Sequence, residues 1–231
     1  MTETVSFLVT DDCHRLGLRA GAVLFRGVRV APSSPALRAE IAAEVERIRA
    51  KYAGPAEMRA VPEVAAFGEV LRKVGVNPRK EQPSVERLLN FALKRGDLPA
   101  INNLVDAYNL ISVRSLCSLG AHDLDRIRCP VSLRLLTGAE SFIPLGHDAP
   151  VPVTAGEYGY VDADNRVLCR LDLLQAEFSK VMTEAVNVLL IVEGTTAHTP
   201  EMLRRAFAEV VDAVTHHCGG TAEVVACPAA D

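Results

Sequence analysis

The chain has 231 residues, of which 49% are hydrophobic and 23% are charged, and 25 Lys and Arg against 29 Asp and Glu give a net charge of −4. This composition excludes a disordered chain, a collagen-like chain and a disulfide miniprotein, and it fits a globular protein with a buried core. The negative charge argues against a protein that grips nucleic acid through bulk positive charge, whereas a local basic surface is compatible with it.

The six cysteines are scattered along the chain and form no CxxC pair. Residues 1–5 lack the basic start and apolar stretch of an export signal, so we expect reduced thiols in a cytoplasmic protein. The longest apolar runs, such as 188–192, are too short to span a bilayer and favour buried strands. The sequence therefore predicts no membrane partner.

In chain order, short strands come first and a group of helices follows. Ser33, Ser34 and Pro35 are typical of a capped helix start, and the apolar residues of 36–51 recur every three or four positions, as on one face of a helix. The predicted strands lie at 5–9, 18–24 and 28–30, and the further helices at 61–74, 85–94 and 101–112.

From residue 113 the pattern changes to short strands and turns, until Thr199 and Pro200 open a last helix over 201–216. Because helices and strands alternate without a strict βαβ rhythm, we expect an α+β fold with a mixed or antiparallel sheet and flanking helices. No linker or repeat divides the chain, so residues 1–231 are predicted to form a single domain. The predicted strands here lie at 131–136, 142–145, 159–162, 167–171, 186–192 and 224–225.

Several strong catalytic motifs are absent: there is no GxGxxG after a strand, no P-loop, no HExxH and no GxSxG. His216, His217 and Cys218, with Cys227 nine residues on, match no standard zinc spacing and are predicted to end a helix. No metal or other cofactor is expected. Cys117 and His122 can be drawn as a thiol–base pair, but a lone Cys in an apolar stretch is usually a small buried side chain.

The predicted helix at 101–112 is unusually rich in short polar side chains, with Asn102, Asn103, Asp106 and Asn109 within eight residues. The solvent face of a helix is normally filled by Lys, Glu and Arg, because short amides and carboxylates favour other backbone conformations. This pattern predicts hydrogen bonds to something specific, either the adjacent loop or a ligand.

The stretch LPAINNLVDAYNLIS followed by GAHDLDRI resembles the B3/B4 tRNA-binding and editing domain of the phenylalanyl-tRNA synthetase beta chain. More closely, it resembles the free-standing proteins built from that domain. SVERLL before this motif, and TGAESFIPLG and AGEYGYVDADNRVLCR after it, extend the similarity to about residues 60–225.

The resemblance implies an α+β domain with a pocket for the aminoacyl group on the 3′ end of a tRNA. It further implies a trans-editing hydrolase that deacylates mischarged aminoacyl-tRNA. The alternative is a non-catalytic protein, which uses the pocket for a free amino acid or small amine or serves as a tRNA-binding adaptor.

The resemblance also implies roles for individual residues. Asn109 aligns with a pocket asparagine of the synthetase domain, which implies a place at the reacting ester. The synthetase's pocket histidine falls on Gly120, so His122, two positions later, is the second catalytic candidate. Candidates for substrate binding are Asn102, Asp106, Tyr108, Gly120, Glu140, Glu157, Asp172 and Gln175, the last four as partners of the α-ammonium group.

Family members often have Trp-Asn-x-Arg after Cys-Arg, whereas this chain reads Leu-Asp-Leu-Leu-Gln and contains no Trp. That wall of the pocket is therefore expected to differ, and the missing histidine argues against tyrosine as the substrate. An aminoacyl ester is already activated, so orienting one water and stabilising the developing oxyanion suffices for hydrolysis.

A basic stretch within this acidic chain predicts a tRNA contact. Residues 72–95 hold seven cations and two anions, Glu81 and Glu86. Phosphate contacts gain affinity by releasing counterions, although a solvated helix face would look the same in the sequence. The predicted tRNA-binding residues are Arg72, Lys73, Arg79, Lys80, Arg87, Lys94 and Arg95.

Overall fold

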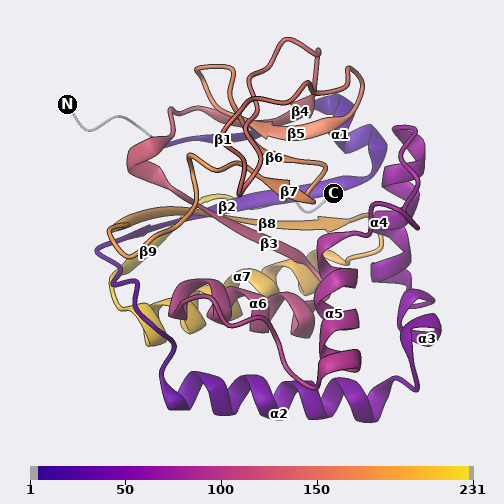
Figure 1. Cartoon of the computed structure of the whole chain (residues 1–231), viewed down its shortest axis with the longest axis vertical. Coiled ribbons are helices and arrows are strands. Elements are labelled where there is room, and N and C mark those ends of the chain that lie inside the picture. Colours follow the sequence, from indigo (N-terminus) through magenta and orange to yellow (C-terminus); the bar gives the residue numbers. More distant parts are fainter. Residues whose placement is uncertain (1–4, 229–231) are drawn as a thin grey trace.

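Two β-sheets lie one above the other, and a layer of helices covers the free face of the second sheet (Figure 1). This arrangement is described for residues 5–228 by a computed structural model. One apolar cluster fills the space between the sheets, and a larger one fills the space between the second sheet and the helices.

The first sheet is mixed. The first two strands in its spatial order pair in parallel, and all the remaining neighbouring pairs are antiparallel. In spatial order it contains β1 (Phe7–Val9), β4 (Val131–Leu135), β5 (Tyr158–Val161), β6 (Val167–Arg170) and β7 (Leu174–Gln175).

The second sheet is antiparallel throughout, in the order β3 (Ser118–Asp123), β8 (Asn187–Thr195), β2 (Leu18–Arg26) and β9 (Thr221–Ala226). β2 and β8 pair along their whole lengths and are apolar on both faces, because one face meets the first sheet and the other meets the helices. β3 is an edge strand of this sheet.

Helices α6 (Asn103–Ser115) and α7 (Pro200–Cys218) lie side by side against the second sheet, and α2 (Pro35–Lys51) runs beneath them (Figure 1). α5 (Ser84–Arg95) stands at one end of this layer, beside α3 (Pro55–Arg59) and α4 (Pro62–Lys73). Two short helical segments complete the described elements, α1 (Asp11–Leu16) and η1 (Leu124–Arg126).

The predicted α+β class, with mixed and antiparallel sheets and flanking helices, is confirmed. Serine and threonine side chains cap α2 and α7 as their sequences indicate: Ser34 accepts from the Leu37 amide and Thr199 from the Met202 amide. Within residues 5–228, no helix combines the length and the apolar character that crossing a membrane requires.

Other predictions about elements were wrong. Residues 28–30 form no strand, and residues 142–145 contain only an isolated bridge at Pro144. α1, α3 and β3 were not predicted. α1 and α3 are too short to show a helical period, and β3 reads SLGAHD, whose mixed small and polar residues hide a strand that is paired on one side only.

Candidate functional site

A cavity of about 470 Å³ opens where the β3 edge of the second sheet meets the β7 end of the first, with α5 and α6 forming its other side. Its rim is apolar and exposed, and includes Phe91, Ile101 and Leu145. Large apolar side chains are seldom left in water next to one another without a partner, so this rim favours a ligand with an apolar part.

The polar groups of the cavity gather at its floor. Asn109 and Tyr108 come from α6, Gly120 from β3, and Asp172 and Gln175 from the turn that leads into β7 and from β7 itself. Gln175 Nε2 donates to the Ala121 carbonyl oxygen at 2.9 Å, which fastens β7 to the free edge of β3. A floor assembled from three separate segments is therefore held in one piece.

Behind this floor lies a hollow of about 20 Å³, roughly the room that one water needs. Gly120, Cys169, Asp172 and Gln175 line both the cavity and the hollow, so the two adjoin. The hollow is further lined by Ser118, His122, Tyr160 and Ile191.

Gly120 keeps this floor open. A Cβ atom added at Gly120 would meet nothing within 4 Å, and the residue does not have a positive φ. Any side chain here would extend into free space in an ordinary backbone conformation.

Asp172 is placed by a strained turn. Leu171 and Asp172 have φ values of 56° and 57°, in the left-handed region that Asp tolerates but that Leu seldom adopts. The turn is held by the Leu171 amide, which donates to the Tyr158 carbonyl, and by Arg87, whose Nη2 donates to the Leu173 carbonyl at 2.9 Å. Such strain persists only where the surroundings enforce it, and here it directs a carboxyl group to the cavity floor.

Two buried carboxyl groups interact near this floor: Asp172, which lines it, and Glu193, which lies behind it. Glu193, on β8, is fully buried, and Tyr160 of the facing sheet donates its hydroxyl to Glu193 Oε2. Glu193 Oε1 and Asp172 Oδ2 are both buried and find no hydrogen-bond partner among residues 5–228. An unpaired buried polar atom is costly, so this pair has unused capacity to bind a donor.

The pKa values of both acids are raised. Burial raises the pKa of Asp172 to about 7, against a partial lowering by the Ser118 hydroxyl and the Arg87 guanidinium. Burial also raises the pKa of Glu193 well above its usual value, and the nearby Asp172 charge raises it further. At neutral pH the pair therefore shares fewer than two negative charges, and an arriving cation would favour its ionised form.

His122 is buried and borders the small hollow, and its Nδ1 lies 2.9 Å from the Ser179 hydroxyl. Burial lowers its pKa to about 4, so the imidazole is neutral at neutral pH. A neutral imidazole held in this way can bind a water molecule, but it is a weak base.

The polar residues of α6 divide into two groups. Asn102 caps the helix by accepting from the Val105 amide, and Asp106 accepts from the Ile101 amide and the Ser33 hydroxyl. These contacts satisfy both side chains within the protein, so their role is structural and they are left out of the ligand site. By contrast, Asn109 lines the cavity, and no hydrogen bond of its side chain is found within the described residues 5–228.

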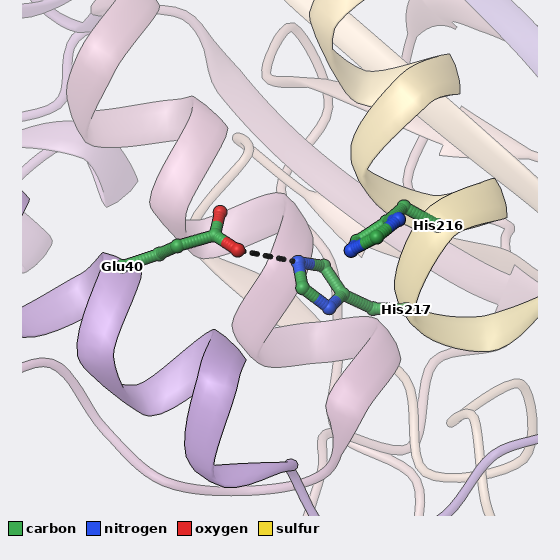
Figure 2. A group of neighbouring side chains, drawn as sticks. All are labelled: Glu40, His216 and His217. Atoms are coloured by element: carbon green, nitrogen blue, oxygen red, sulfur yellow. Dashed lines mark ion pairs between the residues drawn. The ribbon is translucent and has the colours of Figure 1, made fainter.

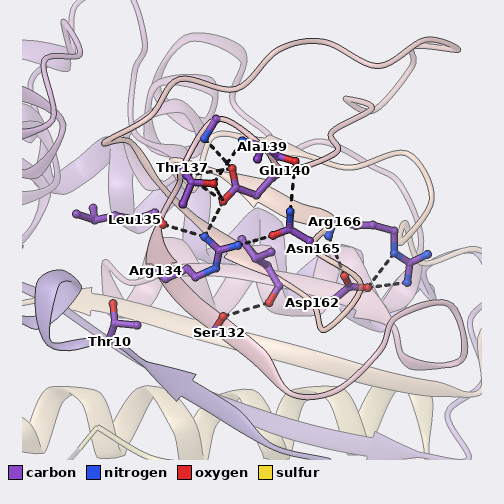
Figure 3. Close-up of polar contacts among 12 residues, drawn as sticks. Thr10, Ser132, Arg134, Leu135, Thr137, Ala139, Glu140, Asp162, Asn165 and Arg166 are labelled. Atoms are coloured by element: carbon purple, nitrogen blue, oxygen red, sulfur yellow. Dashed lines mark hydrogen bonds and ion pairs between the residues drawn. The ribbon is translucent and has the colours of Figure 1, made fainter.

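Glu140 and Glu157 do not line the cavity. Glu140 accepts from Arg134 at 2.6 Å and from the Thr137 and Gly138 amides (Figure 3). Burial alone would raise the pKa of Glu140, but these hydrogen bonds outweigh it and lower the pKa to about 2. Glu157 is bound at both oxygens by Arg170. Because both carboxylates are already paired with arginines, the structure does not support a role for Glu140 or Glu157 in binding an α-ammonium group.

The basic stretch 72–95 does not form one patch. Arg72 and Arg79 line a polar groove between α4 and α5, while Lys73 donates to the Leu16 carbonyl. Arg87 instead borders the candidate site. Lys94 and Arg95 lie in the last turn of α5, two turns beyond Arg87, and Lys80 is exposed in the loop before this helix.

Sequence reasoning missed Glu193, Tyr160 and Ser118. Glu193 lies in the apolar strand sequence VLLIVEGT, and a carboxylate in the middle of a buried central strand is rare unless it is paired or functional. A single carboxylate within this apolar run is the sequence signal that could have identified Glu193. Tyr160 and Ser118 carry no such signal, because the stacking of the two sheets brings Tyr160 to Glu193 and the pairing of β3 with β8 places Ser118 opposite it.

Comparison with known proteins agrees with the fold. The family model of the B3/4 domain matches residues 66–219, two thirds of the chain. Among solved structures, an N-terminal fragment of the phenylalanyl-tRNA synthetase beta-subunit from Pyrococcus horikoshii is similar, with a TM-score of 0.51 and 13% identity. The match covers 95% of this chain but only 50% of that fragment, and at this identity it shows the fold alone. No curated protein matches.

Proposed function

We propose that this chain, which belongs to the B3/4 domain family, binds the aminoacylated 3′ end of a tRNA and hydrolyses the ester of a mischarged amino acid. The observation that supports this most is the cavity itself: an apolar rim above a floor where Asn109, Asp172 and Gln175 converge. An aminoacyl ester presents matching chemistry, with an ammonium group, a carbonyl and a side chain within a few ångströms.

In this proposal the Asp172 carboxylate accepts from the α-ammonium group of the ester. The unpartnered Oδ2 atom provides the acceptor, and the ammonium charge stabilises the ionised form of an acid whose pKa lies near 7. The amino-acid side chain then rests against the apolar wall. The base of the terminal nucleotide remains at the exposed rim.

Asn109 orients the ester, and the amide of its side chain donates to the carbonyl oxygen as negative charge develops there. The water that attacks is held in the hollow bordered by His122 and Gly120. Because the ester is already activated, positioning this water and stabilising the oxyanion supply the rate, and a strong nucleophile is not required.

The enzymatic test is a panel of misacylated tRNAs incubated with the protein, with release of the amino acid measured over time. We expect turnover on at least one member of the panel and a loss of about 100-fold in the Asn109→Ala variant. Asn187→Ala, at the far end of β8 where the side chain contacts Asp125, is the matched control and should react at the unchanged rate.

Turnover that survives Asn109→Ala would remove the catalytic assignment. Tight binding without turnover on the whole panel would favour the alternative, a binder of a free amino acid or small amine. That alternative is favoured by one feature, the weakly basic and buried His122.

The tRNA body is proposed to contact Arg79 and Lys80 before α5 and Arg87 at the border of the cavity. Reversing Arg79, Lys80 and Arg87 to Glu should weaken tRNA binding and reduce the slope of log affinity against log salt by about 1 for each phosphate that is no longer bound. Filter binding between about 50 and 200 mM salt measures both effects. In this range a protein with many phosphate contacts loses about 10³-fold or more in affinity. Unchanged curves would refute this role.

A further inference from the structure

Glu40 of α2 and the adjacent His216 and His217 of α7 meet on the helical side of the molecule (Figure 2). One ligand atom from each of the three lies within 4.8 Å of the others. Residue 40 and residues 216–217 are far apart in the sequence, so only the packing of α2 near the end of α7 brings them together. This explains why the spacing of the two histidines and Cys218 along the chain gave no metal pattern.

The spacing of two of these atoms fits a shared ion better than a direct contact. His217 Nε2 lies 3.4 Å from Glu40 Oε1, longer than a normal N–H···O hydrogen bond. Two ligands on a tetrahedral zinc at about 2.1 Å are separated by about 3.4 Å. The His216 ring stands across that of His217 at 4.6 Å between centroids, and His216 is exposed, so its side chain is free to turn toward the same point.

The backbone beneath these side chains is fixed. Asn103 donates from Nδ2 to the His217 carbonyl and to the Arg29 carbonyl, each at 3.0 Å, and its Oδ1 accepts from the Ala31 amide. One buried amide thereby ties the end of α7 to the segment that leads into α2. A metal site needs ligand-bearing elements held in this way, because preorganisation lowers the cost of assembling the ligands.

The electrostatics also favour a cation. The two histidines occupy the last turn of α7, where the carbonyl ends of the helix carry partial negative charge, and Glu40 adds a carboxylate. Two imidazoles with one carboxylate form a donor set that zinc and its neighbours prefer, whereas Mg²⁺ and Ca²⁺ prefer oxygen ligands alone.

We propose that Glu40, His216 and His217 form a binding site for a divalent transition-metal ion of the Zn²⁺ class, with solvent in the fourth position. The ion joins α2 to α7 and stabilises their packing. The site is independent of the ester-hydrolysing function proposed for the β3–β7 cavity.

The test uses the untagged full chain, stripped with EDTA and titrated with Zn²⁺ in competition with a chromophoric chelator. We expect one equivalent to bind, and the same ion to raise the Tm by a few degrees through preferential binding to the folded state. Mg²⁺ should do neither. Glu40→Gln and His216→Ala change exposed side chains and should each weaken binding at least tenfold. His217→Ala should do the same, with circular dichroism to confirm its fold.

Two control variants separate this site from other zinc ligands. His147→Ala alters an exposed histidine in a distant turn, and Cys227→Ser removes the exposed thiol. Both should bind Zn²⁺ as the unaltered chain does. The proposal would be overturned if the unaltered chain bound no Zn²⁺, or if Glu40→Gln and His216→Ala bound it as tightly as the unaltered chain does. Loss of Zn²⁺ binding in Cys227→Ser would also overturn it.

Discussion

The two halves of α6 carry the same kinds of polar side chain and use them differently. At its start, Asn102, Asn103 and Asp106 make hydrogen bonds to neighbouring loops and helix ends. One turn further, the side chain of Asn109 makes none within residues 5–228 and borders the cavity that Asp172, with its unpartnered Oδ2, also lines. The difference shows that residue type alone does not mark a ligand site; what marks it is bonding capacity that the folded chain leaves unused.

The largest expected effect lies at the satisfied end of α6. Asp106 is buried, with Arg38 Nη1 3.6 Å from its carboxylate in addition to its two hydrogen bonds. Asp106→Ala should lower the free energy of unfolding by about 3 kcal/mol, because it leaves the Ile101 amide and the Ser33 hydroxyl without an acceptor and removes the carboxylate beside Arg38. Urea denaturation measures this loss.

Asn109→Ala is the matched change at the other end, and it should cost less than about 1 kcal/mol in the same experiment while reducing deacylation. Equal destabilisation by the two substitutions would erase the distinction between the two halves of the helix.

An intermediate effect is expected from filling the cavity floor. Gly120→Leu places a side chain in open space, so ligand affinity should fall on the order of tenfold with little change in Tm. Binding of a non-hydrolysable aminoacyl-adenosine analogue by calorimetry is the measurement. Gly54→Leu, where an added Cβ also meets nothing within 4 Å, is the control and should bind normally. Full affinity in Gly120→Leu would place the ligand elsewhere.

The smallest effect, counted per pH unit, is on the pH dependence of stability. Burial raises the pKa of Asp172 from 3.8 to about 7 on folding, so the folded chain holds a proton that the unfolded chain has released. This contribution to stability is complete below pH 3.8 and is lost as pH rises through 7. Stability should therefore fall by up to about 1.4 kcal/mol per pH unit from this group as pH rises between those values.

Asp172→Asn should flatten that part of the profile and leave only the part of the Glu193 contribution that comes from burial, because the Asp172 charge no longer raises the pKa of Glu193. Unfolding free energies at pH 5, 6 and 7 compare the two chains. A profile of equal slope in both would show that Asp172 does not hold a proton in the folded state.

The sequence predicted the α+β class and its long helices because α2, α5 and α7 repeat their apolar residues with a helical period. It did not predict β3, whose Ser118, Gly120 and His122 resemble a loop until β8 pairs with them. Short edge strands depend on tertiary pairing, which leaves little trace in local composition.

For the site, resemblance singled out Asn109, Asp172 and Gln175, all of which line the cavity. It could not separate Asp172 from Glu140, because Arg134 of β4 and the amides of the following loop reach the Glu140 carboxylate only in the folded chain. Glu193 was hidden in an apolar strand, and its proximity to the other acid depends on how the two sheets stack.

The most direct test is a crystal structure of the protein with a non-hydrolysable aminoacyl-adenosine analogue. We expect the ammonium nitrogen within hydrogen-bonding distance of Asp172, the amide of Asn109 at the ester carbonyl and the amino-acid side chain against the apolar wall. An analogue bound away from the β3–β7 cavity, or a cavity closed by its own side chains with Asn109 bonded to protein, would contradict the proposed site.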